Sequence, residues 1–151
     1  MYKYMAEAIE MAKIGESRGE VPIGAVIVRG NEIIAKEHNR VEELRDPSAH
    51  CEHLAIRSAC ATLGEKYLMD CDLYVTLEPC PMCAGAIVLS KLKRVIFGAM
   101  DYKAGACGSL YMIASDKRLN HRAEVISGIM QNECSELLIN FFTKLRLDKT
   151  P

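Results

Sequence analysis

The spacing of apolar residues predicts helices and short strands in alternation along the chain. Residues 4–17 carry a helical stripe of apolar side chains separated by charged ones, which predicts an amphipathic helix that ends near Gly15–Gly19. Two apolar runs, Ile23–Val28 and Glu32–Ala35, then flank the turn Arg29–Asn31. A short polar turn with a glycine between such runs is typical of a β-hairpin.

A break at Asp46–Ser48 separates the hairpin from a second predicted helix. Ser48 suits the N-cap of a helix over Ala49–Leu63, and Gly64 ends it. The next predicted elements are a strand over Asp72–Leu77 and a helix that begins at Pro81. They are followed by a strand over Arg94–Phe97, closed by Gly98, and by a glycine-rich loop at Gly105–Gly108. The last two are a short edge strand at Val125–Ile126 and an amphipathic helix over Met130–Leu145.

This order of elements predicts the fold class. A hairpin followed by strand, helix and strand gives a mixed sheet with helices on both faces. We therefore expect a three-layer α/β/α sandwich around a central mixed five-stranded sheet. The 151 residues suit one domain with a sizeable core, and we find no repeat or linker, so residues 1–151 are predicted to form a single domain.

Composition and net charge exclude several classes of protein. Half of the residues are hydrophobic and 26% are charged, as in ordinary folded proteins. No apolar run approaches the roughly 18 residues of a membrane helix, and the N-terminus lacks an apolar export segment, so we expect a cytoplasmic protein without membrane contact. The net charge of −1 argues against a general nucleic-acid coat protein.

The charge is unevenly distributed. Residues 1–88 hold nine basic and fourteen acidic side chains, whereas residues 89–151 hold ten and six, so the two parts carry net charges of −5 and +4. The second part could present a basic face to a nucleic acid. Lysines solvated on helix surfaces explain the same numbers equally well.

Seven cysteines without an export segment indicate reduced thiols rather than a disulfide framework. Five of them are best explained as small buried apolar residues: Cys51, Cys60, Cys71, Cys107 and Cys134. The other two, Cys80 and Cys83, form the sequence Cys-Pro-Met-Cys at the start of a predicted helix. This spacing is typical of a metal or redox site.

The candidate chemistry combines this cysteine pair with His50 and Glu52, which begin the preceding helix. Two thiolates and one imidazole suit zinc, and a set of three protein ligands leaves a fourth position for water. A helix N-terminus favours the thiolate form of cysteine. Glu52 is then free to act as the proton carrier.

Three alternatives compete with this catalytic zinc site. Cys80 and Cys83 could be a redox pair. A structural zinc site would need a fourth ligand, for which Cys51, Cys71 and His53 are available. Polar residues at a helix start are also often merely solvated, and helical periodicity alone does not aim residues 50 and 52 at one metal. Taken together and in this order, His-x-Glu and Pro-Cys-x-x-Cys match the pattern of zinc nucleobase deaminases.

From its N-terminus to about Arg146, the sequence resembles the bacterial tRNA-specific adenosine deaminases, which are a branch of the cytidine-deaminase-like superfamily. The similar stretches are Glu20–Val26, His38-Asn39, Asp46–Glu52, Tyr74–Gly85, Arg94–Ala99, Gly105–Leu110, Asn120–Arg122 and Phe141-Phe142. The zinc motifs are shared across the superfamily, whereas the later stretches resemble the tRNA branch.

The resemblance implies a role for each matching residue. It implies one Zn²⁺ per subunit on His50, Cys80 and Cys83, with Glu52 as the catalytic proton shuttle. It places Asn39 at the base or ribose of a flipped nucleotide. It places other residues near the RNA, namely Asp101 and Lys103 in one loop and Phe142, Lys144 and Arg146 on the last helix. It also implies a homodimer that binds a tRNA anticodon stem-loop, without an organic cofactor.

The implied reaction is hydrolytic deamination of the wobble adenosine to inosine, in an arginine tRNA with anticodon ACG. Three positions depart from the family pattern: Cys51 for alanine, Ala104 for threonine, and Thr143 for a basic residue. The main rival function is deamination of a free base or nucleoside such as guanine or cytosine, because the same zinc centre serves those reactions. A non-catalytic RNA-binding subunit is a second rival, although Glu52 argues against it.

Overall fold

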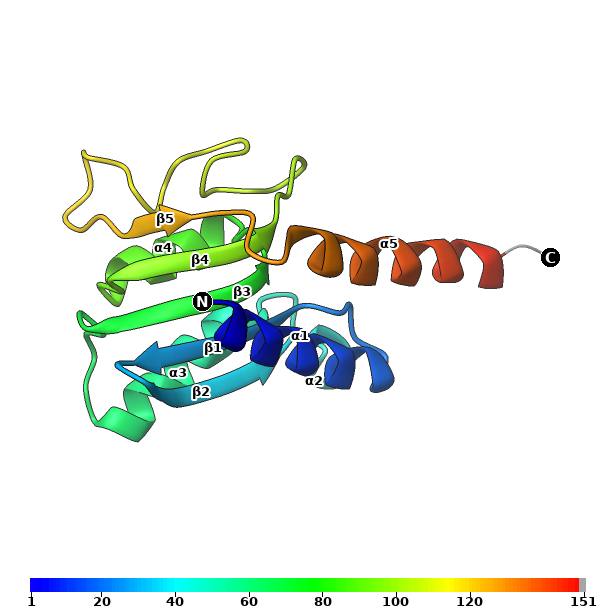
Figure 1. Cartoon of the computed structure of the whole chain (residues 1–151), viewed down its shortest axis with the longest axis horizontal. Helices are drawn as coiled ribbons and strands as arrows, with labels where there is room; N and C mark the ends of the chain where they lie inside the picture. The colour runs from blue at the N-terminus through cyan, green and yellow to red at the C-terminus, as the bar shows by residue number, and fades with distance from the viewer. Residues whose placement is uncertain (150–151) are drawn as a thin grey trace.

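Five strands form one mixed sheet in the order β2-β1-β3-β4-β5 (Figure 1). The computed structural model describes residues 1–149. The strands are β1 (Gly24–Arg29), β2 (Glu32–His38), β3 (Cys71–Leu77), β4 (Arg94–Ala99) and β5 (Glu124–Ile126). The helices are α1 (Tyr2–Ser17), α2 (Val41–Leu44), α3 (Cys51–Leu63), α4 (Pro81–Leu89) and α5 (Gln131–Asp148).

The strand pairing follows from the connections. β1 pairs antiparallel with β2, with which it forms the hairpin, and it also pairs antiparallel with β3 on its other side. β3 and β4 are joined through α4 and pair in parallel, and β5 adds in parallel to β4. The predicted hairpin, strand–helix–strand unit and edge strand are confirmed.

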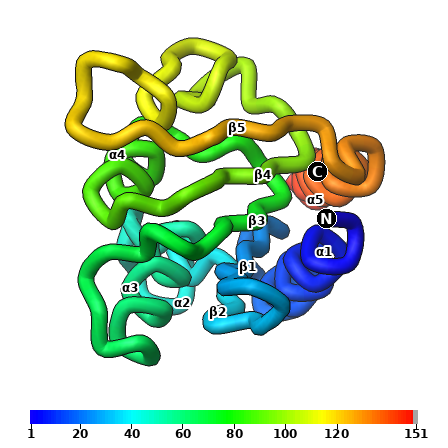
Figure 2. Tube along the Cα trace, turned by 60° about the vertical axis from the view of Figure 1, so that its left-hand side comes forward, coloured from blue at the N-terminus to red at the C-terminus, as the bar shows by residue number. Residues whose placement is uncertain are grey.

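The helices cover both faces of the sheet. α1 and α5 lie on one face, while α3 and α4 lie on the other (Figure 2). The larger core lies under α3 and α4 and includes Leu73, Ile87 and Phe97, all fully buried. The smaller core lies under α1 and includes Met5 and Val26. The predicted three-layer α/β/α sandwich is therefore confirmed.

One predicted strand end is wrong, because β4 continues through Gly98 to Ala99. A side chain at Gly98 would overlap the Cys134 thiol of α5 and crowd the carbonyl of Thr76. The glycine is thus present because α5 packs closely over the strand, not because the strand ends there.

The predicted cap of the second helix is also wrong. The N–H and hydroxyl of Ser48 both donate to Asp46 Oδ1, at 2.9 and 2.7 Å, so Ser48 closes a local turn. The helix begins at Cys51, and His50 is its N-cap residue in an extended conformation. The sequence predicts a break at this turn but carries no signal for the hydrogen bonds within it.

The C-terminal helix differs from the others in its surroundings. α5 runs on past the ends of the strands (Figure 1), and its outer half exposes Phe142, Leu145 and Leu147. Cys134, near its start, is buried against the sheet. Over residues 1–149, no helix is long and apolar enough to cross a membrane.

Candidate metal centre and substrate pocket

Two helix N-termini carry the predicted metal ligands. His50 occupies the N-cap position of α3, and Cys80 occupies that of α4; both have an extended backbone. Cys83 lies in the first turn of α4. Pro81 takes the first helical position, where its missing N–H costs nothing. Because the N-terminal ends of both helices carry partial positive charge, thiolates are stabilised there.

The three ligand atoms have the separations of a zinc site. His50 Nδ1 lies 3.5 Å from Cys80 Sγ and 3.7 Å from Cys83 Sγ. Zinc bonds of about 2.3 Å to sulfur and 2.0–2.1 Å to nitrogen, at a tetrahedral angle, separate the two atoms by about 3.6 Å. Within residues 1–149 these three side chains form the one group of candidate ligands. The donor set and its geometry therefore fit zinc with one coordination position open.

The two thiols of the cluster differ in acidity. Hydrogen bonds from the Cys83 thiol and from His50 lower the pKa of Cys80 to about 4. The pKa of Cys83 is raised, because its thiol is engaged with Cys80 and buried. A bound cation would take the place of the Cys83 proton, since thiolates are the ligating form.

Glu52 faces the same site from the first turn of α3. It is buried, and burial raises the pKa of its carboxyl group. The Cys51 thiol donates a hydrogen bond to Glu52 Oε1 at 3.1 Å. Cys51 is therefore engaged with the acid and lies outside the ligand group. Because His50 precedes the helix, residues 50 and 52 both reach the pocket despite their spacing of two.

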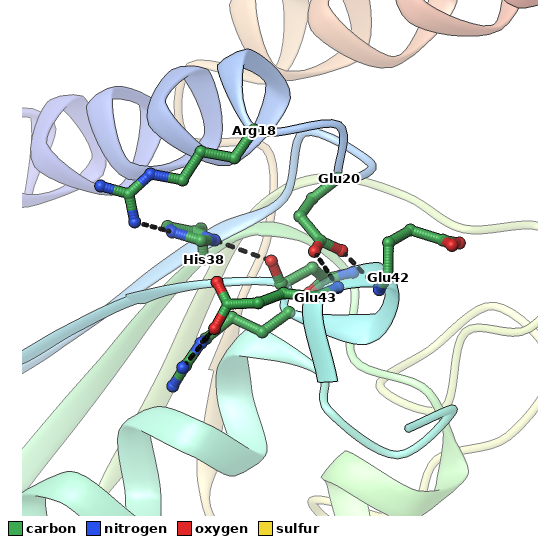
Figure 3. A network of polar contacts seen from close by, with 7 residues as sticks. Arg18, Glu20, His38, Glu42 and Glu43 are labelled. Atoms are coloured by element: carbon green, nitrogen blue, oxygen red, sulfur yellow. Dashed lines mark hydrogen bonds and ion pairs between the residues drawn. The ribbon is translucent and has the colours of Figure 1, made fainter. Parts of the chain in front are cut away.

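The pocket above these residues has a volume of about 330 Å³ and contains Asn39 in its lining. Asn39 Oδ1 accepts the N–H of Cys51 at 2.9 Å, so the amide nitrogen of Asn39 is the group left to bind a ligand. His38 Nδ1 lies 2.7 Å from the Asn39 carbonyl oxygen, and Arg18 Nη1 lies 3.4 Å from His38 Nε2 (Figure 3). Since arginine only donates, His38 Nε2 accepts and Nδ1–H donates.

Glu20 also lines the pocket, although the sequence does not identify it as a site residue. Glu20 is 1% exposed and accepts the N–H groups of Glu42 and Glu43 at 3.0 and 2.8 Å (Figure 3). This carboxylate holds the four-residue helix α2 against the pocket. Glu20 lies in a stretch that resembles the family, but its partners are backbone groups that no motif reveals.

A groove of about 740 Å³ adjoins the pocket between α5 and residues 100–104. Lys103, Phe142 and Arg146 line this groove, and Asp101 lines both cavities. The predicted site residues thus line two adjoining cavities, except Cys83, which is buried beside His50, and Lys144, which lines neither cavity. Phe142 is 42% exposed and stacks edge-to-face on Phe141.

Comparison with known proteins places the chain in a family. The family model of the MafB19-like deaminases, which describes their sequences, matches residues 1–146 of this chain. A Bacillus subtilis protein is 52% identical over 97% of this chain and 91% of its own length, and an Aquifex aeolicus protein is 51% identical over 95% and 94%. Each is named tRNA-specific adenosine deaminase. The chain belongs to the tRNA-specific adenosine deaminase family.

Solved structures agree with this family but also include a different activity. A structure from a study of A-to-I editing by tRNA:A34 deaminases at the wobble position is 43% identical, with a TM-score of 0.88 over 91% of this chain and all of that one. The guanine deaminase of Bacillus subtilis is 42% identical, with a TM-score of 0.65 over 71% and 69%. The chain therefore shares its fold with a guanine deaminase as well.

Proposed function

We propose that this protein is a zinc-dependent hydrolase that converts the wobble adenosine of a tRNA anticodon loop to inosine. The observation that carries the proposal is the cluster of His50, Cys80 and Cys83, with Glu52 lining the same pocket as His50 and Cys80. The relatives named tRNA-specific adenosine deaminase, which match nearly the whole chain at 51–52% identity, supply the substrate class.

His50, Cys80 and Cys83 would hold the metal ion. Bound there, Zn²⁺ supplies a Lewis acid that lowers the pKa of water to about 7. Because two helix N-termini and the neighbouring backbone fix the three ligands, the protein can bind the ion without rearrangement. We assign no organic cofactor to the reaction, because hydrolysis needs only water.

Glu52 moves the protons of the reaction. It takes a proton from the attacking water and delivers it to ring N1 of adenine, which activates C6 for attack. It then takes the proton of the new hydroxyl group on C6 and passes it to the departing amine, which leaves as ammonia while C6 becomes a carbonyl carbon. Burial raises the pKa of the Glu52 carboxyl group, which favours the return of the proton to the substrate.

Asn39 and the groove bind the nucleotides. The amide nitrogen of Asn39 is free to donate to an acceptor on the flipped base or its ribose. Beside the pocket, Phe142 and Tyr102 offer faces for stacking, and Lys103 and Arg146 offer charge to the backbone. The target base is unpaired in the loop, so moving it into the pocket costs only a few kcal/mol.

We also infer that the protein acts as a homodimer in the cytoplasm, where its tRNA substrate is found. Several large apolar side chains are more than half exposed on α4 and on the loop after β4, including Leu89, Leu110 and Met112. A second copy of the chain would cover them. Sedimentation of the purified protein tests this: a monomer at micromolar concentration would contradict it.

Guanine deamination is the second candidate, supported by the structural match to a guanine deaminase. One experiment separates the two functions. The zinc-loaded protein is incubated in parallel with an arginine-tRNA anticodon stem-loop, free adenosine and free guanine, and inosine, xanthine and ammonia are measured. Inosine in the stem-loop supports the proposal, whereas xanthine without stem-loop inosine overturns it.

A further inference from the structure

Glu78 is a buried carboxylate to which the proposed chemistry gives no task. It is 2% exposed and lies two residues before Cys80. Its N–H donates to the Ala99 carbonyl at 2.9 Å, which fixes it at the adjoining ends of β3 and β4. A buried carboxylate is costly unless its oxygens are paired.

The pairing comes entirely from one loop, residues 101–109. Glu78 Oε1 accepts the N–H of Asp101 at 3.0 Å and also the hydroxyl of Ser109. Glu78 Oε2 accepts the N–H groups of Cys107 and Ser109, at 3.0 and 2.9 Å. Four donors therefore occupy the carboxylate, and a side chain at Gly105 would overlap it.

The same loop walls both cavities. Asp101 and Ala104 line the pocket and the groove, and Lys103 lines the groove. Asp101 Oδ1 accepts the N–H groups of Lys103 and Ala104, each at 3.1 Å, so residues 101–104 form one hydrogen-bonded turn. The Asp101 N–H bond to Glu78 ties this turn to the segment that carries Cys80.

We propose that Glu78 is a positioning residue that holds the turn of residues 101–104 at a fixed distance from the metal cluster, so that RNA bound along the turn presents its adenosine to Glu52. This inference rests on the proposed function. Because its four acceptor sites are taken, Glu78 itself has no free oxygen for the substrate. Because the turn lines the groove and carries neither a metal ligand nor Glu52, loss of Glu78 weakens substrate binding more than the chemical step.

The variant Glu78→Gln tests the role with little change of shape. The amide nitrogen of glutamine cannot accept a hydrogen bond. Placed at Oε2, it would face two backbone N–H groups. Placed at Oε1, it would face the Asp101 N–H and the Ser109 hydroxyl, and the hydroxyl can turn to accept. The second placement costs less and releases the Asp101 bond that ties down the turn.

Ser109→Ala is the matched control, because it removes one partner of Oε1 and keeps the Asp101 bond. With the stem-loop as substrate, we expect Glu78→Gln to raise KM about tenfold and to change kcat less than threefold, with wild-type zinc content. We expect Ser109→Ala to change both constants less than threefold. Amide hydrogen exchange at residues 101–104 should be faster in Glu78→Gln than in Ser109→Ala.

Gly105→Ala provides a second route, since its methyl group displaces the loop from an unchanged Glu78. If Glu78→Gln does not fold or lacks zinc, Gly105→Ala must show the same rise in KM. Wild-type KM and exchange in the folded variants would overturn the inference, as would equal effects of Glu78→Gln and Ser109→Ala. If the wild-type protein does not edit the stem-loop, the proposed function fails, and hydrogen exchange alone decides whether Glu78 holds the turn.

Discussion

Asn39 has two separable tasks, and two substitutions distinguish them. Its Oδ1 accepts the Cys51 N–H at the start of α3, while its amide nitrogen is left for the substrate. Asn39→Ala removes both groups, whereas Asn39→Asp keeps an acceptor for Cys51 and removes the donor. The two variants should therefore rank in opposite order for stability and for activity.

The magnitudes follow from the geometry. In Asn39→Ala the buried Cys51 N–H loses its acceptor, which costs about 1–3 kcal/mol of unfolding free energy and lowers Tm by about 2–12 °C in a chain of this size. Asn39→Asp should lower Tm less than Asn39→Ala does, because one carboxylate oxygen keeps the Cys51 bond at a helix N-terminus. For activity, Asn39→Ala loses one substrate hydrogen bond, about 2–12-fold in kcat/KM.

Asn39→Asp should lose more activity, about 10–100-fold, because it sets an acceptor against an acceptor of the substrate. The assays are thermal unfolding of the zinc-loaded proteins and inosine formation in the anticodon stem-loop. A drop in Tm for Asn39→Asp as large as that of Asn39→Ala would refute the bond to Cys51 as its structural role. Wild-type kcat/KM in Asn39→Asp would remove the amide nitrogen from substrate binding.

Four further predictions test the metal site, the groove and the packing. Glu52→Ala should keep its zinc, measured by elemental analysis, and lose about 10²–10⁴ in kcat; retained inosine formation would exclude Glu52 from proton transfer. Cys51→Ala should leave zinc content and rate nearly unchanged, and zinc loss would make Cys51 a ligand. Phe142→Ala should weaken stem-loop binding by about 1–3 kcal/mol, and an unchanged Kd would exclude stacking there. Gly98→Ala should cost about 1–3 kcal/mol of stability in denaturant unfolding, because its methyl group overlaps Cys134; wild-type stability would show that α5 can shift.

The sequence was informative where chemistry and periodicity coincide. His50, Cys80 and Cys83 could be predicted as one cluster because their residue types and helix-start positions point to the same ion, and the structure brings them together. The mixed sheet with helices on both faces could be predicted because the hairpin and the strand–helix–strand unit permit few arrangements, whereas the strand order comes from the structure.

The remainder depends on tertiary contacts that leave no local signal. Ser48 resembles an N-cap in isolation, but it bonds to Asp46 instead. Gly98 resembles a strand end, although its role is to admit α5. Glu20 and Glu78 resemble solvated acids, and only the folded chain brings backbone N–H groups to them.

The bonding of Glu20 and Glu78 has a consequence for the response to ionic strength. Both anchoring carboxylates are buried and bind uncharged backbone and hydroxyl donors, so dissolved salt has little access to them. Attraction between phosphates and surface lysines or arginines, in contrast, falls steeply as salt is added. A rise in potassium chloride concentration should thus lower the affinity for RNA, while the residues that line the adenine pocket keep their positions. A single salt titration would then separate the contribution of long-range electrostatic attraction from that of contacts within the pocket.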